Sequence, residues 1–253
     1  MTAKTDANGG YILQLQNFSV NDGNGIRTII FMAGCPLRCA WCANPEGLTL
    51  KNPMTSYMTA DRVIEKIKKQ MIFYRHSKGG VTFSGGEATF QTEFLRSLVN
   101  RLYDMGIHLA LETCGYFSFD AVCDILQKMD LIFMDCKLMD PRKHLRWTQK
   151  DNALIHENIK KTYALGIPMV LRIPTIVNVN ADRDNMKETF SFIQQNVPDA
   201  QLEFLPYHQF GEEKYKQLGM PLPEKSFGTP EASLIEEFTE LAHEYDIETV
   251  SYR

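Results

Sequence analysis

Three cysteines stand close together near the start of the chain. Cys35, Cys39 and Cys42 have the spacing C-x3-C-x2-C. A structural zinc site normally takes four ligands, often as two C-x2-C pairs, and no second pair follows in this sequence. Three thiolates can instead hold three irons of a 4Fe–4S cluster and leave the fourth iron open to a small chelating molecule. The spacing therefore favours a cluster, and zinc with Cys114, Cys136 or a histidine as fourth ligand is the alternative.

The segments around these cysteines indicate how they are positioned. The cysteines directly follow residues 26–34, which are rich in β-branched side chains and are typical of a buried strand. Residues 11–20 read as an opening strand or hairpin arm. Further strands are expected at 81–86, 107–115, 131–137, 168–174 and 200–208, and helices at 61–71, 94–102, 119–129, 154–164, 184–197 and 231–245.

This alternation of strands and helices predicts a parallel sheet with helical crossovers. It repeats about six times, where a closed barrel of this kind needs eight units. The fold class expected is α/β, an incomplete (β/α)6 barrel that resembles a TIM barrel. No internal repeat or linker interrupts the pattern, so residues 1–253 are expected to form a single domain.

Polar residues gather where the expected strands end. They are Ser84, Gly85, Gly86, Glu87, Glu112, Thr113, Asp135, Lys137, Arg172 and His208. The carboxyl ends of parallel strands form one rim of a barrel, and chemistry sits at that rim. Asp135 and Lys137 are two residues apart and share one face of a strand. Arg172 lies in an apolar strand, where it needs either a ligand carboxylate or a buried ion pair.

Composition excludes several classes of protein. The chain has 253 residues, of which 44% are hydrophobic and 23% charged, and this is ordinary for a soluble globular protein. The net charge of −4 argues against a nucleic-acid binder that works by bulk charge. No apolar run approaches the roughly 18 residues needed to span a membrane. The first ten residues lack the apolar core of a signal peptide, so a cytoplasmic protein is expected.

Five motifs together carry a family resemblance. The segment GCPLRCAWCANP, which begins at Gly34, resembles the signature loop of the radical S-adenosylmethionine (SAM) superfamily. Four others resemble motifs of the glycyl radical enzyme activating enzymes. They are DGNGIR from Asp22, GGVTFSGGE from Gly79, MDCK from Met134 and LPYH from Leu205. The motifs occur in the family's order and extend over residues 22–208, which is most of the chain.

The resemblance also predicts how many clusters the chain holds. No cysteine lies between Cys42 and Cys114, so the ferredoxin-like insert of some members is expected to be absent. One cluster is therefore expected, as in compact members such as the pyruvate formate-lyase activating enzymes. The Cys-Pro-Leu-Arg segment and the run from Phe73 nevertheless look more like the members that carry the insert.

The resemblance implies a radical activity. Cys35, Cys39 and Cys42 would bind a 4Fe–4S cluster, and its reduction would cleave SAM to a 5′-deoxyadenosyl radical. The radical would then take a hydrogen from a backbone glycine of a partner glycyl radical enzyme, in an oxidoreductase of anaerobic metabolism. A flavodoxin or ferredoxin-type protein would supply the electron. A monomer is expected, with neither nucleic acid nor a membrane as partner.

The resemblance also assigns the ligand-binding residues. Lys137 would act with the three cysteines in catalysis and bind the carboxylate of SAM. The full set expected to bind SAM is Trp41, Cys42, Ala43, Ser84, Gly85, Gly86, Glu87, Asp135, Cys136, Lys137, Arg172 and His208. Glu112, Thr113 and Asp135 would hold a monovalent cation, although Asp is the commoner residue at the position of Glu112.

Two other functions remain open from the sequence. One is a radical SAM enzyme that acts on a small molecule, and the other is a zinc-stabilised binding protein without chemistry. An incomplete barrel leaves a lateral opening wide enough for a peptide loop, which favours a protein substrate over a small molecule. A rim lined with polar residues argues against a purely structural zinc module.

Overall fold

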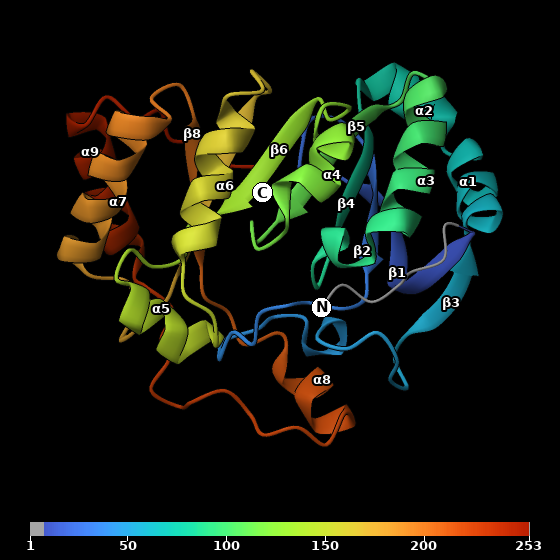
Figure 1. Ribbon diagram of the computed structural model, residues 1–253. Coiled ribbons are helices and arrows are strands. Elements are labelled where there is room, and N and C mark those ends of the chain that lie inside the picture. Colours follow the sequence, from blue (N-terminus) through green and yellow to red (C-terminus); the bar gives the residue numbers. More distant parts are fainter. Residues whose placement is uncertain (1–7, 253) are drawn as a thin grey trace.

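A single mixed sheet organises the chain. The computed structural model describes residues 8–252 (Figure 1). The sheet has eight strands in the order β3-β1-β2-β4-β5-β6-β7-β8, so its two ends, β3 and β8, do not meet. The strands are β1 Gly9–Ser19, β2 Arg27–Met32, β3 Ser56–Thr59, β4 Gly80–Gly85, β5 His108–Thr113, β6 Leu131–Asp135, β7 Met169–Thr175 and β8 Gln201–Pro206.

The strand directions confirm the incomplete barrel that the sequence predicts. Strands β2, β4, β5, β6, β7 and β8 run parallel to one another. β1 pairs with β2 in antiparallel fashion, as expected of a hairpin arm. β3, which the sequence pattern did not predict, extends the sheet beyond β1.

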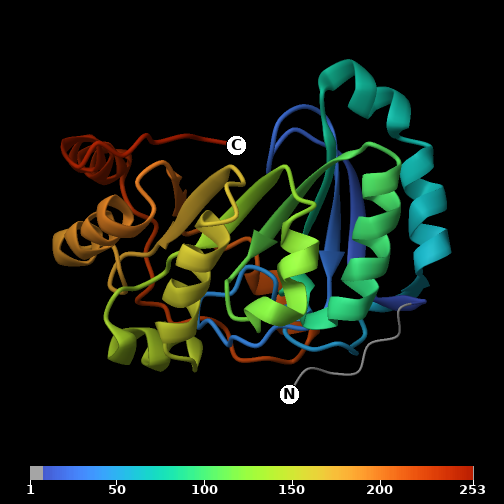
Figure 2. The same cartoon turned by 45° about the horizontal axis from the view of Figure 1, so that its top comes forward.

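Helices surround the sheet, most of them on its outer face and two, at residues 141–148 and 212–217, at its lower end (Figures 1 and 2). They are α1 Ala60–Lys68, α2 Met71–Ser77, α3 Thr92–Asp104, α4 Phe119–Leu126, α5 Pro141–Thr148, α6 Ala153–Tyr163, α7 Arg183–Asn196, α8 Glu212–Gln217 and α9 Ala232–Glu244, with 3-10 turns at Pro45–Gly47 and Ala88–Gln91. Sequence periodicity located five of the long helices to within a few residues. None of the described helices is long and apolar enough to cross a bilayer.

The parallel strands form because their residues are apolar on both faces. Leu111 and Leu171 are fully buried in the main hydrophobic core, and their strand neighbours Ala110 and Val170 are fully buried in a separate cluster on the other face. Such continuous apolar runs are typical of parallel strands that are covered on both sides. Several helices begin at a side-chain cap. The Asp182 carboxylate, for example, accepts a hydrogen bond from the Asn185 amide at the start of α7.

The helix predicted at residues 61–71 is two helices in the structure. α1 ends at Lys68 and α2 begins at Met71. The break lets α2 fold over the start of β2, where the Tyr74 hydroxyl donates to the Thr28 hydroxyl at 2.5 Å. The Ser77 hydroxyl accepts from the Ile26 amide at 2.8 Å. These buried polar contacts stabilise the turn in a way that helical periodicity does not reveal.

Three connections gather at the carboxyl ends of the parallel strands. They are the segment that follows β2, the segment that carries α5, and the long segment between β8 and α9 that carries α8. Figure 1 shows them together at the lower end of the molecule. Three segments that are far apart in the sequence therefore cover the carboxyl ends of the parallel strands.

Candidate active site

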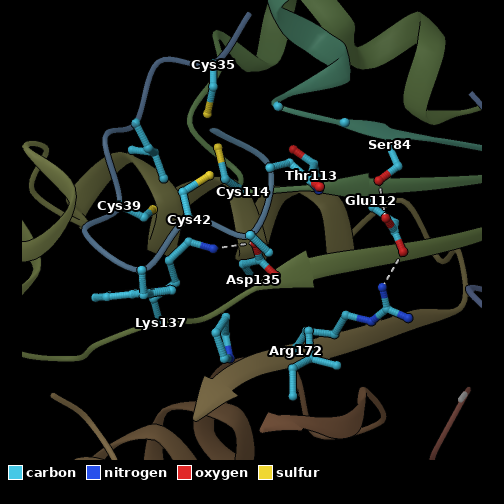
Figure 3. A pocket seen from close by; sticks show the side chains of 18 of the residues that line it. Cys35, Cys39, Cys42, Ser84, Glu112, Thr113, Cys114, Asp135, Lys137 and Arg172 are labelled. Carbon is cyan, nitrogen blue, oxygen red and sulfur yellow. Dashed lines mark hydrogen bonds and ion pairs between the residues drawn. The ribbon is translucent and has the colours of Figure 1, made fainter. Parts of the chain in front are cut away.

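A cavity of about 270 Å³ opens at the carboxyl ends of the parallel strands. Its walls come from residues 33–47 after β2, here called the cysteine segment, and from the ends of β4, β5, β6, β7 and β8 (Figure 3). Most of the residues predicted for the site line this cavity: Cys35, Cys39, Trp41, Cys42, Ala43, Ser84, Gly85, Gly86, Glu112, Thr113, Asp135, Lys137, Arg172 and His208. The structure therefore brings together residues that are far apart in the sequence.

Hydrogen bonds fix the shape of the cysteine segment. The Arg38 guanidinium donates to the Cys35 carbonyl at 2.6 Å. The amides of Arg38 and Ala40 donate to the carbonyls of Thr148 and Trp147 at 2.8 and 2.9 Å. The end of α5 therefore holds one side of the segment.

Helix α8 holds the other side of the cysteine segment. The Tyr215 hydroxyl donates to the Cys42 carbonyl at 3.0 Å. The Lys214 ammonium donates to the Asn44 amide oxygen at 2.9 Å and to Glu46 at 2.6 Å. The sequence pattern did not predict this helix, and a six-residue helix leaves little periodic signal.

The glycines after β4 allow two backbones to approach closely. A Cβ on Gly86 would lie 2.2 Å from the Gly47 carbonyl oxygen, so only glycine fits there. The Gly86 amide donates to the Met32 carbonyl at 2.9 Å, and the Glu87 amide donates to the Gly34 carbonyl at 2.8 Å. The end of β4 is thereby joined to the start of the cysteine segment.

Two predicted site residues lie outside the cavity wall. The Glu87 carboxylate accepts hydrogen bonds from the Thr113 hydroxyl at 2.9 Å and from the Cys114 amide at 2.7 Å. The Cys136 thiol contacts the Met139 sulfur at 3.8 Å, on the core side of the strand. Glu87 therefore supports the site from behind, and the Cys136 side chain packs in the hydrophobic core.

Lys137 carries a buried positive charge into the cavity. Its side chain is only 7% exposed and forms an ion pair with Asp135 (Figure 3). Burial alone would lower the pKa of Lys137, but the negative charge of Asp135 and the hydrogen bond to it more than offset this and raise it above its ordinary value. An ammonium group has three N–H donors, so Lys137 can bind Asp135 and a second acceptor together.

Burial changes the acidity of the thiols in the cysteine segment. Burial raises the pKa of Cys42 to about 12 and holds the pKa of Cys39 above its ordinary value. These thiols therefore stay protonated at neutral pH until a metal centre displaces the protons. Among the residues that the structure describes, no three His, Cys, Asp or Glu side chains are arranged to hold a single metal ion.

Arg172 is surrounded by three carboxylates. Its guanidinium contacts Glu203 at 2.8 Å and Asp22 at 3.0 Å, and it also pairs with Glu112. The guanidinium lies over the Phe133 ring, 3.8 Å from the ring centroid. The sequence left two kinds of partner open for Arg172, a ligand carboxylate and a buried ion pair. The structure shows the ion pair. Glu203 and its role were missed, although a glutamate inside an apolar strand is the same signal that pointed to Arg172.

The three predicted cation ligands bond to different partners in the protein. Glu112 bonds to Arg172 and to the Ser84 hydroxyl. The Thr113 hydroxyl donates to Glu87, and Asp135 pairs with Lys137. Each of the three side chains thus has its own structural partner inside the cavity wall.

Glu112 gives a testable pH dependence. Burial and the nearby Asp22 charge raise the pKa of Glu112 to about 7 from its ordinary 4.5, although Arg172 opposes the shift. The folded chain therefore binds more protons than the unfolded chain between these values, and the free energy of unfolding falls as pH rises through them. We expect this fall to be smaller in Glu112→Gln, measured by urea unfolding at a series of pH values. Parallel pH profiles for the two proteins would contradict the shift.

Aromatic side chains border the mouth of the cavity. Trp41 is buried, and its ring meets the Phe227 ring edge-on at 6.4 Å. His208 lies at the exposed rim and stacks on Phe210 at 4.6 Å. Phe210 itself is 84% exposed. The mouth therefore offers apolar surface next to a polar interior.

Comparison with known proteins identifies related chains. The model of the radical SAM superfamily matches residues 29–192. The trans-4-hydroxy-L-proline dehydratase activating enzyme of Clostridioides difficile is 30% identical, over 91% of this chain and 95% of that enzyme. The pyruvate formate-lyase-activating enzyme of Staphylococcus epidermidis is 31% identical, over 90% of this chain and 93% of that enzyme.

Solved structures agree with the fold. A domain of the pyruvate-formate lyase-activating enzyme from Bacteroides vulgatus has a TM-score of 0.58 and 28% identity, over 68% of this chain and 98% of that domain. A radical SAM methyltransferase from Sphaerobacter thermophilus has a TM-score of 0.64 over 93% of this chain and 76% of that protein. Its identity is 15%, so that likeness concerns the fold alone.

Proposed function

The chain belongs to the radical SAM superfamily, and from this premise we propose how its own residues carry out the activation of a glycyl radical enzyme. The chain matches activating enzymes over almost their whole length, and it is an enzyme of that kind. The superfamily's cofactors are a 4Fe–4S cluster and SAM, so the zinc alternative is set aside. One observation carries the assignment of residues: three cysteines line the same cavity as a buried lysine and a glycine-rich strand end.

The donors in the cavity fit these cofactors. Cys35, Cys39 and Cys42 would hold the cluster, because thiolates are the usual ligands of such clusters. When bound, the cluster supplies the single electron that cleaves SAM to a 5′-deoxyadenosyl radical. Hydrogen bonds to α5 and α8 hold the cysteine segment in place. Such preorganisation orients ligands and improves metal affinity.

The remaining walls would bind and orient SAM. Lys137 would donate to the carboxylate of its methionine part while it keeps its ion pair with Asp135. The amides of Gly86 and Glu87 already donate to the carbonyls of Met32 and Gly34, so carbonyl oxygens at the end of β4 would accept from the ammonium group. Trp41, Ala43 and His208 would border the adenosine part. Because the side chains are mostly buried, the cavity keeps bulk water away from the reacting atoms.

The open side of the sheet would admit the substrate. The two ends of the sheet do not meet, and the exposed Phe210 lies beside His208 at the rim. A glycine-bearing loop of the partner enzyme could reach the cavity by this route. Arg172, Glu112 and Asp22 would serve as the rigid floor under the site, since Arg172 bonds to both carboxylates.

The assignment is tested by anaerobic reconstitution with iron and sulfide. We expect an electron paramagnetic resonance signal from the reduced protein that changes when SAM is added, together with release of 5′-deoxyadenosine. Addition of the cognate glycyl radical enzyme should give a glycyl radical signal. A colourless protein that binds zinc would contradict the assignment, and SAM cleavage with a small molecule in place of a protein would redirect it.

Lys137 is expected to matter for SAM more than for the cluster. Replacing a charged hydrogen-bond donor costs about 1.5–3 kcal/mol, which corresponds to about ten- to a hundredfold in affinity. Lys137→Met should therefore raise the Kd for SAM by that factor and leave the iron content unchanged, as measured by calorimetry and metal analysis. Lys143→Met, on the exposed face of α5, is the control and should bind SAM normally. Equal affinity of the two variants would exclude the proposed contact.

Three further points are part of the proposal. A flavodoxin or ferredoxin-type protein would deliver the electron, because the cluster needs a one-electron donor of low potential. A monomer with residues 1–253 as one domain is part of the proposal, and one continuous sheet that includes all eight strands supports the single domain. The six free cysteines suit the reducing cytoplasm. Reduction assays with each donor, sedimentation analysis and cell fractionation test these points.

A further inference from the structure

Cys114 has no role in the proposed cofactor binding, yet it lies in the cavity wall beside a cluster ligand. It directly follows β5 and is 6% exposed, and Cys35 is 8% exposed. Both residues pack in one small cluster with Leu37 and Leu48. Figure 3 shows the Cys35 side chain pointing down toward the Cys114 sulfur, which points up from the strand end.

The two thiols belong to one buried cluster and also line the same cavity. A small disulfide that enters the cavity can therefore reach both of them. Each thiol stands next to a glycine with a positive φ angle, 90° at Gly34 before Cys35 and 76° at Gly115 after Cys114, so each lies at a backbone turn where its strand ends.

The other cysteines are less suited to pair with Cys35. Cys123 belongs to α4 and does not line the cavity. The Cys136 thiol contacts Met139 in the core. Cys39 and Cys42 are only half-buried and lie at the border of the cluster in which Cys35 and Cys114 are both buried. Within the described residues, Cys114 is therefore the favoured partner for Cys35.

We propose that Cys35 and Cys114 form a redox pair, whose disulfide in the cluster-free chain removes one of the three cluster ligands. This inference rests on the proposed function only in that Cys35 is a cluster ligand. The oxidant is a low-molecular-weight disulfide, which enters through the open cavity. The Cys35 thiolate attacks one of its sulfurs and releases one small thiol, which leaves a mixed disulfide on Cys35.

Cys114 completes the exchange. Its sulfur attacks Cys35 in the mixed disulfide, the Cys35–Cys114 bond forms, and the second small thiol leaves with the Cys114 proton. The two cysteines are thus oxidised by two electrons, and the small disulfide is reduced to two thiols. Cluster and disulfide compete for the same sulfur, so the chain loads iron only after the bond is reduced.

The test uses cluster-free full-length protein, reduced and then treated anaerobically with 2-hydroxyethyl disulfide. Peptide mapping without reductant should find Cys35 linked to Cys114. The treated protein should lose most of its capacity to take up iron, and dithiothreitol should restore it. Protein that already holds its cluster should not form the link.

Two variants provide the controls. Cys114→Ser should take up iron normally when reduced, and after treatment it should carry a mercaptoethanol adduct on Cys35 in place of the link. Cys123→Ser should behave as the wild type. A link between Cys39 and Cys42 in place of the predicted one, or full iron uptake by the linked protein, would overturn the proposal. If the reduced wild type fails to take up iron while the link forms, the cluster assignment fails and the pair stands.

Discussion

Cys39→Ala is expected to lose both its cluster and its activity. The variant removes one of three thiolate ligands, and Cys114, a further thiol in the cavity wall, packs beside Cys35. Loss of a group that only orients a metal ligand already costs ten- to a hundredfold, so loss of a ligand should lower 5′-deoxyadenosine formation by at least about a hundredfold. Iron analysis, visible absorption and chromatography of the nucleoside measure the effect.

Matched variants separate the ligands from the other cysteines. Cys35→Ala and Cys42→Ala should behave as Cys39→Ala does. Cys123→Ala, on the outer helix α4, should keep its iron and its activity. Cys114→Ala should keep its iron under reducing conditions. Iron loss in Cys114→Ala would show that the cluster has a fourth protein ligand and would contradict the assignment of three.

Arg172→Met is expected to have the largest effect on stability. The side chains of Arg172 and Glu203 are 6% and 1% exposed, and the guanidinium also bonds to Asp22 and Glu112. Methionine fills similar space but leaves these carboxylates without a positive partner. Removal of one member of a buried ion pair costs about 3–5 kcal/mol. Urea unfolding should therefore show a loss of this size, because the remaining carboxylates must be protonated or hydrated.

Arg183→Met is the matched control. Arg183 pairs with Glu237 on the surface, with side chains 54% and 44% exposed. Surface ion pairs contribute about 0–1 kcal/mol, so this variant should unfold almost as the wild type does. A similar loss in both variants would mean that the buried network is no more important than a surface pair. Arg172→Lys should recover only part of the stability, because an ammonium group cannot reproduce the planar contacts to three carboxylates.

The sequence predicted the strands and long helices well because each has a strong local pattern. Buried parallel strands are apolar throughout, as in β7, and the crossover helices have apolar residues at helical spacing. The converging strand ends follow from parallel topology, so the sequence alone was enough to place Lys137 and His208 at one cavity. The cysteine spacing predicted the metal chemistry from three residues.

What the sequence did not predict depends on contacts between distant segments. Short elements such as β3 and α8 have little periodicity, and they form because contacts with the rest of the fold stabilise them. The partners of Arg172 come from three separate segments, and no local pattern indicates that they meet. Glu87 matched a functional motif, but its carboxylate turned out to support Thr113 and the backbone after β5.

The hydrogen bonds between α8 and the cysteine segment have a consequence for how the protein folds during its synthesis. Tyr215 reaches the Cys42 carbonyl across 173 residues of sequence. A ribosome delivers the cysteines long before it delivers α8, and domains fold as their last required segments emerge. The cysteine segment therefore reaches its final shape only near the end of translation. We expect the cell's iron–sulfur assembly machinery to meet an almost completed chain, and not a nascent one.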